Sequence, residues 1–161
     1  AFLDKAPTFP HITLEYGHPD RYNLHLKLLR SLIILDGGDP ARALTLFPRD
    51  LLEPLDRGEP SWSDTEARFV FGRLLCANGR ALEGVEAIGV VLRREEAKRY
   101  EHAPELAYWR AAAGLCALQA GDRKSARTWA QQARESFIVQ PGVSDFYKAP
   151  LLELEAKLAK R

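Results

Sequence analysis

The sequence has no methionine, two cysteines, four histidines and almost no net charge. Its 23 Lys and Arg residues nearly balance its 22 Asp and Glu residues, so it lacks the positive excess typical of nucleic-acid-binding proteins. No apolar run approaches the roughly 18 to 20 residues that a bilayer-spanning helix needs. The first residues also lack the basic start and apolar centre of a signal peptide. We therefore expect no direct nucleic-acid binding and no membrane span, and the absent starting methionine favours a domain of a longer chain.

Residues that could support catalysis or metal binding are scarce and scattered. The histidines (His11, His18, His25 and His102) show no metal-ligand spacing with Cys76 or Cys116. No HExxH, CxxC, GxSxG or Walker pattern is present, and these patterns mark common hydrolase, redox and nucleotide sites. We expect no enzyme activity, cofactor or metal. We interpret the two cysteines as reduced core residues, with a disulfide as the alternative, and reduced cysteines fit a cytoplasmic location.

Three glycine turns divide the sequence at nearly equal intervals. Gly38, Gly79 and Gly121 each follow an apolar stretch and precede a polar residue, 41 and then 42 positions apart. A small residue lies seven positions before each turn glycine and another lies five positions after it: Ser31, Gly72 and Gly114, then Ala43, Gly84 and Ala126. A shared register of this kind indicates stacked supersecondary repeats.

Each repeat has the apolar spacing of two helices. After the second turn, one helical face holds Ala81, Val85, Ile88 and Leu92, and the third repeat matches it with Ala126, Ala130, Ala133 and Phe137. Glycine costs roughly 1 kcal/mol against alanine inside a helix, so the small residues in register predict close contact between neighbouring helices.

The prolines set the predicted boundaries. Pro19 and Pro104 suit the first turn of a helix, where a missing N–H costs nothing, whereas Pro48 and Pro54 interrupt the second helix of the first repeat. We expect repeats over about 18–58, 61–99 and 102–142, a cap over 145–160 whose helix covers about 150–160, and an extension or linker over 1–17. The predicted fold is all-α, with about three helix pairs and a C-terminal capping helix.

This pattern resembles the tetratricopeptide repeat. The clearest match is GLCALQAGDRKSARTWAQQA, Gly114 to Ala133, and the resemblance extends over about 24–161. The period of 41 to 42 residues is similar to the longer kinesin-light-chain type, as is the run His102 to Ala107. The resemblance implies a right-handed α-solenoid that acts as a protein-binding scaffold, a kind common in bacterial signalling and regulatory proteins. Leu28 and Leu32 replace two residues that grip a chaperone's terminal carboxylate in the family, so we do not expect chaperone-tail binding.

The expected partner site is a concave groove along the first helices of the repeats, where a peptide or helix would lie. Its predicted partner-binding residues are Lys27, Leu28, Leu32, Arg68, Phe69, Arg73, Tyr108, Arg110 and Leu115. Three of these are cations in equivalent positions, which favours an acidic partner. The alternative is that their stems lie along apolar neighbours while their heads pair with a local glutamate such as Glu66 or Glu105.

Two further alternatives remain open at this level. The aromatic residues Trp109, Trp129, Phe137, Phe146 and Tyr147 can form a binding patch, although helical spacing in a solenoid favours a place in the core. The whole domain can instead serve a structural role, in which it packs on a neighbouring domain or on a second copy as a homodimer.

Overall fold

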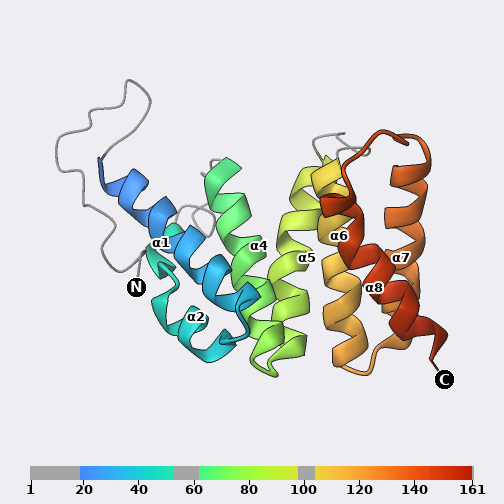
Figure 1. Ribbon diagram of the computed structural model, residues 1–161, viewed down its shortest axis with the longest axis horizontal. Helices are drawn as coiled ribbons and strands as arrows, with labels where there is room; N and C mark the ends of the chain where they lie inside the picture. The colour runs from blue at the N-terminus through green and yellow to red at the C-terminus, as the bar shows by residue number, and fades with distance from the viewer. Residues whose placement is uncertain (1–18, 53–61, 98–103, 161) are drawn as a thin grey trace. The chain divides into compact units, whose positions relative to one another are not determined.

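The computed structural model describes residues 19–52, 62–97 and 104–160, and every regular element within these ranges is helical (Figure 1). The α-helices are α1 (Pro19–Asp36), α2 (Pro40–Leu46), α4 (Trp62–Ala77), α5 (Ala81–Ala97), α6 (Pro104–Gln119), α7 (Arg123–Ile138) and α8 (Asp145–Ala159). The all-α prediction is therefore confirmed for the described ranges. The chain forms two compact units that meet in sequence between Val70 and Phe71, inside α4. The predicted extension over 1–17 lies outside the described residues.

The first unit contains α1, α2 and the beginning of α4. Helix α1 begins at Pro19 as predicted, and α2 ends at Leu46, just before Pro48. A 3₁₀ turn over Arg49–Leu51 follows, because a proline cannot donate the hydrogen bond that would continue the preceding helix. The predicted interruption is thus confirmed at Pro48, whereas Pro54 lies outside the described residues.

The three turn glycines adopt the same backbone conformation. Gly38, Gly79 and Gly121 have φ values of 87°, 78° and 83°, in the left-handed region that glycine enters without steric cost. In each turn the residue after the glycine donates its N–H to a carbonyl five positions earlier, at 3.1, 2.9 and 2.9 Å. This repeated turn ends α1, α4 and α6 and reverses the chain into the following helix, as the glycine spacing predicts.

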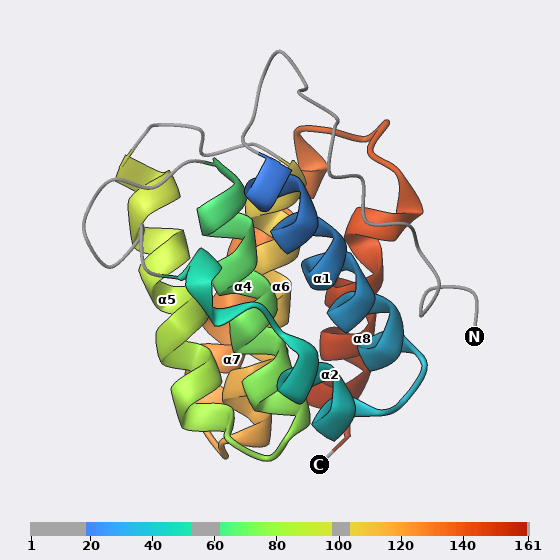
Figure 2. The same cartoon turned by 90° about the vertical axis from the view of Figure 1, so that its left-hand side faces the viewer.

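The second unit is organised around α6, which packs against α5, α7 and α8. Figure 2 shows α5 and α7 on one side of this unit and α6 and α8 on the other. Its core is rich in alanine, and the buried members of the cluster are Ala107, Ala111, Ala117, Ala126, Ala130, Ala133, Phe137, Leu151 and Leu154. Small side chains let helix backbones approach closely, so this core forms with few large residues.

The small residues in register lie where helices of one pair meet. A Cβ on Gly72 would come within 2.5 Å of Ile88 Cγ1 and 3.0 Å of the Gly84 carbonyl oxygen. A Cβ on Gly114 would meet Trp129 of the paired helix α7 at 3.2 Å and, still closer, the side chain of Leu154 from α8. The matching residues of the first pair, Ser31 and Ala43, are fully buried. The predicted close contacts at these small-residue positions are confirmed.

The two cysteines are paired, so the prediction of reduced core residues is wrong. Cys76 at the end of α4 and Cys116 in α6 form a disulfide with a Cα–Cα distance of 5.6 Å. Both residues are buried as expected, but the packing of α6 beside α4 brings them together from positions 40 residues apart. Disulfides persist mainly in oxidising compartments, so the cysteines do not support the predicted cytoplasmic location.

Helix α8 begins five residues before the predicted start at Pro150. The hydroxyl of Ser144 accepts a hydrogen bond from the Phe146 N–H at 3.3 Å, which caps the helix from Asp145. Pro150 consequently lies inside the helix, where it removes one backbone hydrogen bond. Burial of Leu151 and Leu154 on the core side offsets that loss and keeps the helix continuous.

Candidate functional site

The predicted partner-binding residues of the first unit differ in exposure. Lys27 is exposed, and Leu32 and Arg68 are half-buried. Leu28 and Phe69 are each only 3% exposed, because they lie on the apolar side of their helices rather than on a free surface. A buried side chain cannot contact a partner without rearrangement, so these two residues are core residues in this structure.

Arg110 of the second unit is also buried, at 9% exposure. Its guanidinium donates to Glu96 Oε1 and to the Ser136 hydroxyl, both at 3.1 Å. The arrangement matches the alternative in which the stem is covered and the head pairs with a carboxylate, although the partner is Glu96 rather than Glu66 or Glu105. Arg110 is therefore not an exposed cation in line with Lys27 and Arg68, contrary to the prediction from the equivalent positions of the three residues.

Three aromatic rings gather near the N-terminal ends of α6 and α8. Phe146 stacks on Tyr108 with ring centroids 5.6 Å apart and an interplanar angle of 13°. Tyr147 meets both rings edge-on, at 6.2 Å from Tyr108 and 5.4 Å from Phe146. We call Tyr108, Phe146 and Tyr147 the aromatic cluster. These offset-stacked and edge-to-face geometries are the favoured ones for aromatic pairs.

Polar contacts hold two of these rings in place. Arg73 from α4 donates a hydrogen bond to the Tyr108 hydroxyl at 3.1 Å, and the Tyr147 hydroxyl donates to Glu105 Oε1 at 3.2 Å. Phe146 has no polar group to satisfy and remains 67% exposed. The cluster therefore offers one exposed apolar ring beside two tyrosines whose hydroxyls contact a cation and a carboxylate.

The sequence predicts this cluster only in part. Arg73 and Tyr108 were predicted to line the partner site, whereas Phe146 and Tyr147 were expected in the core with the other aromatic residues. Trp109 and Phe137 do lie in the core, at 6% and 8% exposure. Ser144 is the sequence feature that could have indicated the exposure of Phe146, because a helix cap at Ser144 places Phe146 in the first turn of α8.

Leu115 lies half-buried on α6 and packs against the core of the second unit. Its position reduces the apolar area that it can offer to a partner. The predicted groove residues of the second unit thus divide into Arg73 and Tyr108, which join the aromatic cluster, Leu115, which mainly supports the core, and Arg110, which is buried.

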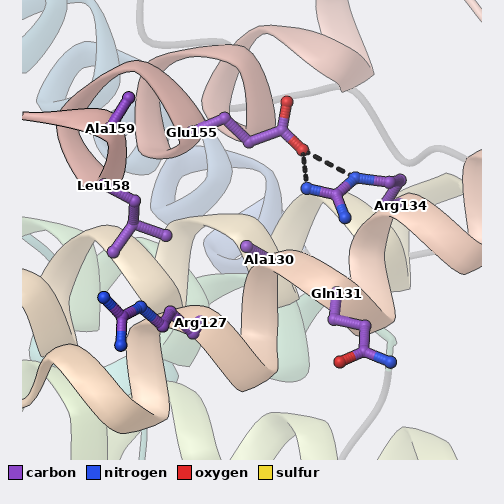
Figure 3. A pocket seen from close by; sticks show the side chains of 7 residues that line it. All are labelled: Arg127, Ala130, Gln131, Arg134, Glu155, Leu158 and Ala159. Carbon is purple, nitrogen blue, oxygen red and sulfur yellow. Dashed lines mark hydrogen bonds and ion pairs between the residues drawn. The ribbon is translucent and has the colours of Figure 1, made fainter.

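A second candidate site is a shallow hollow between α7 and α8, with a volume of about 390 Å³ (Figure 3). Its lining consists of Arg127, Ala130, Gln131, Arg134, Glu155, Leu158 and Ala159. The guanidinium of Arg134 closes one side, because its Nε and Nη2 both donate to Glu155 Oε1 at 2.9 and 2.6 Å. Arg123, the first residue of α7, donates to the carbonyl oxygens of Leu158 and Lys160 and so holds the end of α8 against α7.

Ala130 is a small residue in the lining of the hollow. The equivalent residue one repeat earlier, 42 positions before, is the larger Ile88, which is fully buried. The hollow combines an apolar floor with an exposed ion pair, and exposed pairs of this kind contribute little binding energy. Its lining presents no nucleophile beside a base and no close pair of carboxylates.

Within the described ranges, no three His, Cys, Asp or Glu side chains are grouped so that they could hold a metal ion. His11, His18 and His102 lie outside those ranges. No helix among the described residues is long and apolar enough to cross a bilayer. Comparison with known proteins adds no family: no protein-family model, curated protein or solved structure matches this chain.

Proposed function

We propose that this chain is a tetratricopeptide-like helical repeat module, a right-handed α-solenoid that binds a peptide or helix from another protein and catalyses no reaction. The repeated glycine turn and the small-residue contacts support the repeat assignment, since they recur at the 41 to 42 residue period. The binding surface that we propose is the aromatic cluster together with Arg73, on the side of the second unit formed by α6 and α8.

The exposed ring of Phe146 carries this proposal. Folded proteins do expose single apolar side chains, but Phe146 is stacked on a second aromatic ring whose hydroxyl is held by Arg73. Aromatic and arginine residues dominate binding energy at protein interfaces because they offer a large area at low entropic cost. A ligand side chain packed on Phe146 would cover apolar surface that now faces water.

The nearby charges indicate a ligand with both apolar and polar groups. Arg73 and Glu105 lie at the two edges of the aromatic cluster, so neither sign of charge predominates. With Arg110 buried, Lys27 and Arg68 of the first unit are the predicted cations that still favour an acidic partner. An apolar or aromatic anchor residue in an extended peptide is the part of the ligand that the cluster itself supports.

The test is selection of a random twelve-residue peptide library on the immobilised protein, followed by affinity measurement of one enriched peptide by fluorescence polarisation. We expect Phe146→Ala to weaken binding by about thirtyfold, because truncation of an anchoring aromatic typically costs about 2 kcal/mol. Leu82→Ala is the matched control, since Leu82 is an apolar residue of α5 with 75% exposure. Equal affinity for wild type and Phe146→Ala, or failure to enrich any peptide, would contradict the proposal.

A further inference from the structure

The outer face of α8 is an uncovered ridge of apolar residues with charges beside it. We define this face by Leu152, Ala156 and Ala159, all of which are exposed. Leu152 has 63% of its surface accessible. The exposed Glu153 and Lys157 flank the ridge and pair with each other at 2.7 Å. The opposite side of the helix, with Leu151 and Leu154, is buried in the core.

The equivalent face of α6 is covered by another helix. The residues 42 positions before the ridge are Arg110, Gly114 and Ala117, and all three are buried. Helix α7 covers them: the hydroxyl of Ser136 accepts from Arg110, and a Cβ on Gly114 would come within 3.2 Å of Trp129 Cβ. The outer face of α8 is therefore the position at which the repeat geometry would place a second helix.

Charge order along α8 identifies which helix fits this face. The exposed Glu153 precedes Ala156 and the exposed Lys160 follows it, whereas Glu155 pairs with Arg134 of α7 at 2.6 Å. If a second α8 lies antiparallel with a two-fold axis at Ala156, Glu153 of one copy approaches Lys160 of the other, and the same contact forms a second time across the axis. A parallel arrangement would set like charges against each other, which is unfavourable.

The residue at the proposed axis also suits close approach. Packed helices lie about 8 to 10 Å apart, and small side chains at the crossing point favour the shorter distance. Ala156 occupies the same small-residue register as Gly114, 42 positions earlier, where α6 and α7 come into close contact. Leu152 of each copy would then cover the exposed ridge near Ala159 of the other.

We propose that the outer face of α8 is a homodimer interface, on which a second copy of this chain lays its own α8 antiparallel about a two-fold axis at Ala156. The interface is isologous, so each residue contact occurs twice. The proposed interface is independent of peptide binding at the aromatic cluster, because it uses exposed α8 residues that are not part of that cluster.

The test is sedimentation equilibrium of the 161-residue chain over a wide concentration range, with a dimer of the 18.1 kDa chain as the expected associated species. We expect Glu153→Lys and Lys160→Glu each to weaken association by about tenfold, because each change acts twice in a two-fold dimer. The variant that carries both changes should regain association, since the charges are then exchanged rather than made alike. Circular dichroism should report unchanged helix content in all three.

A cross-linking experiment tests the axis itself. Ala156→Cys should form an intermolecular disulfide on mild oxidation, because the two-fold axis brings the two introduced thiols together. Thr128→Cys, an exposed position on α7, is the control and should remain uncross-linked. A monomer at every concentration would overturn the proposal, as would a dimer in which the double reversal restores nothing or both cysteine variants cross-link equally.

Discussion

Reduction of the Cys76–Cys116 disulfide should remove a large part of the stability of this protein. The bond joins residues 40 positions apart, and the chain-entropy relation for a loop of that length corresponds to about 4 kcal/mol of unfolding free energy. For a chain of this size, such a loss lowers the melting temperature by roughly 8 to 16 °C. Both sulfur atoms remain in the core after reduction, so the change isolates the cross-link from cavity formation.

The assay compares urea unfolding of the oxidised protein with that of protein reduced in denaturant and refolded under reductant. Buried disulfides react only when the chain opens, so reduction must precede refolding. The Cys76→Ala/Cys116→Ala double variant is the control, because reductant should leave its unfolding curve unchanged. Its stability should lie near or below that of the reduced protein, since two small cavities are added.

Two results would refute this reasoning. The first is alkylation of both cysteines in unfolded protein that has never met a reductant, which would show that no disulfide exists. The second is a difference of less than about 1 kcal/mol between oxidised and reduced protein, which would mean that the unfolded chain gains little freedom when the bond is broken.

Two further predictions concern the third helix pair. Gly114→Leu should destabilise the protein by about 1 to 3 kcal/mol through overpacking, because a side chain there meets Leu154; a melting temperature equal to that of wild type would contradict the close contact. The hydroxyl and backbone N–H of Ser125 donate to Asp122 and lower the pKa of its carboxyl group. The resulting stabilisation is complete above the ordinary aspartate pKa of about 3.9 and is lost as the pH falls through the lower pKa of the folded state. Asp122→Asn should therefore show a weaker loss of melting temperature between pH 5 and pH 2 than wild type, and parallel curves for the two proteins would count against the assigned hydrogen bonds.

Local features of the fold were predictable because they depend on residues close in sequence. A left-handed turn residue is almost always glycine, so Gly38, Gly79 and Gly121 marked the ends of three helices. Pro19 and Pro104 marked two helix starts for an equally local reason, the absence of an N–H that the first turn does not use. The small-residue register added one longer-range prediction, the close contact within each pair.

The candidate site was less predictable because exposure depends on what each helix packs against. Spacing alone placed Leu28, Phe69 and Arg110 on a groove, but tertiary packing buries all three. Helical spacing also assigned Phe146 to the core, whereas the Ser144 cap starts α8 early and leaves the ring exposed. Periodicity defines a face of a helix, and it does not say which neighbour covers that face.

The sequence by itself determined the helical class, the repeat period and the turns, because hydrophobic spacing and backbone sterics act over a few residues. Only the tertiary structure decided that Cys76 and Cys116 are bonded, that Arg110 is buried against Glu96, and that the outer face of α8 is left uncovered. Each of these depends on the distance between segments far apart in the chain. Those distances follow from how whole helices pack, which no local pattern records.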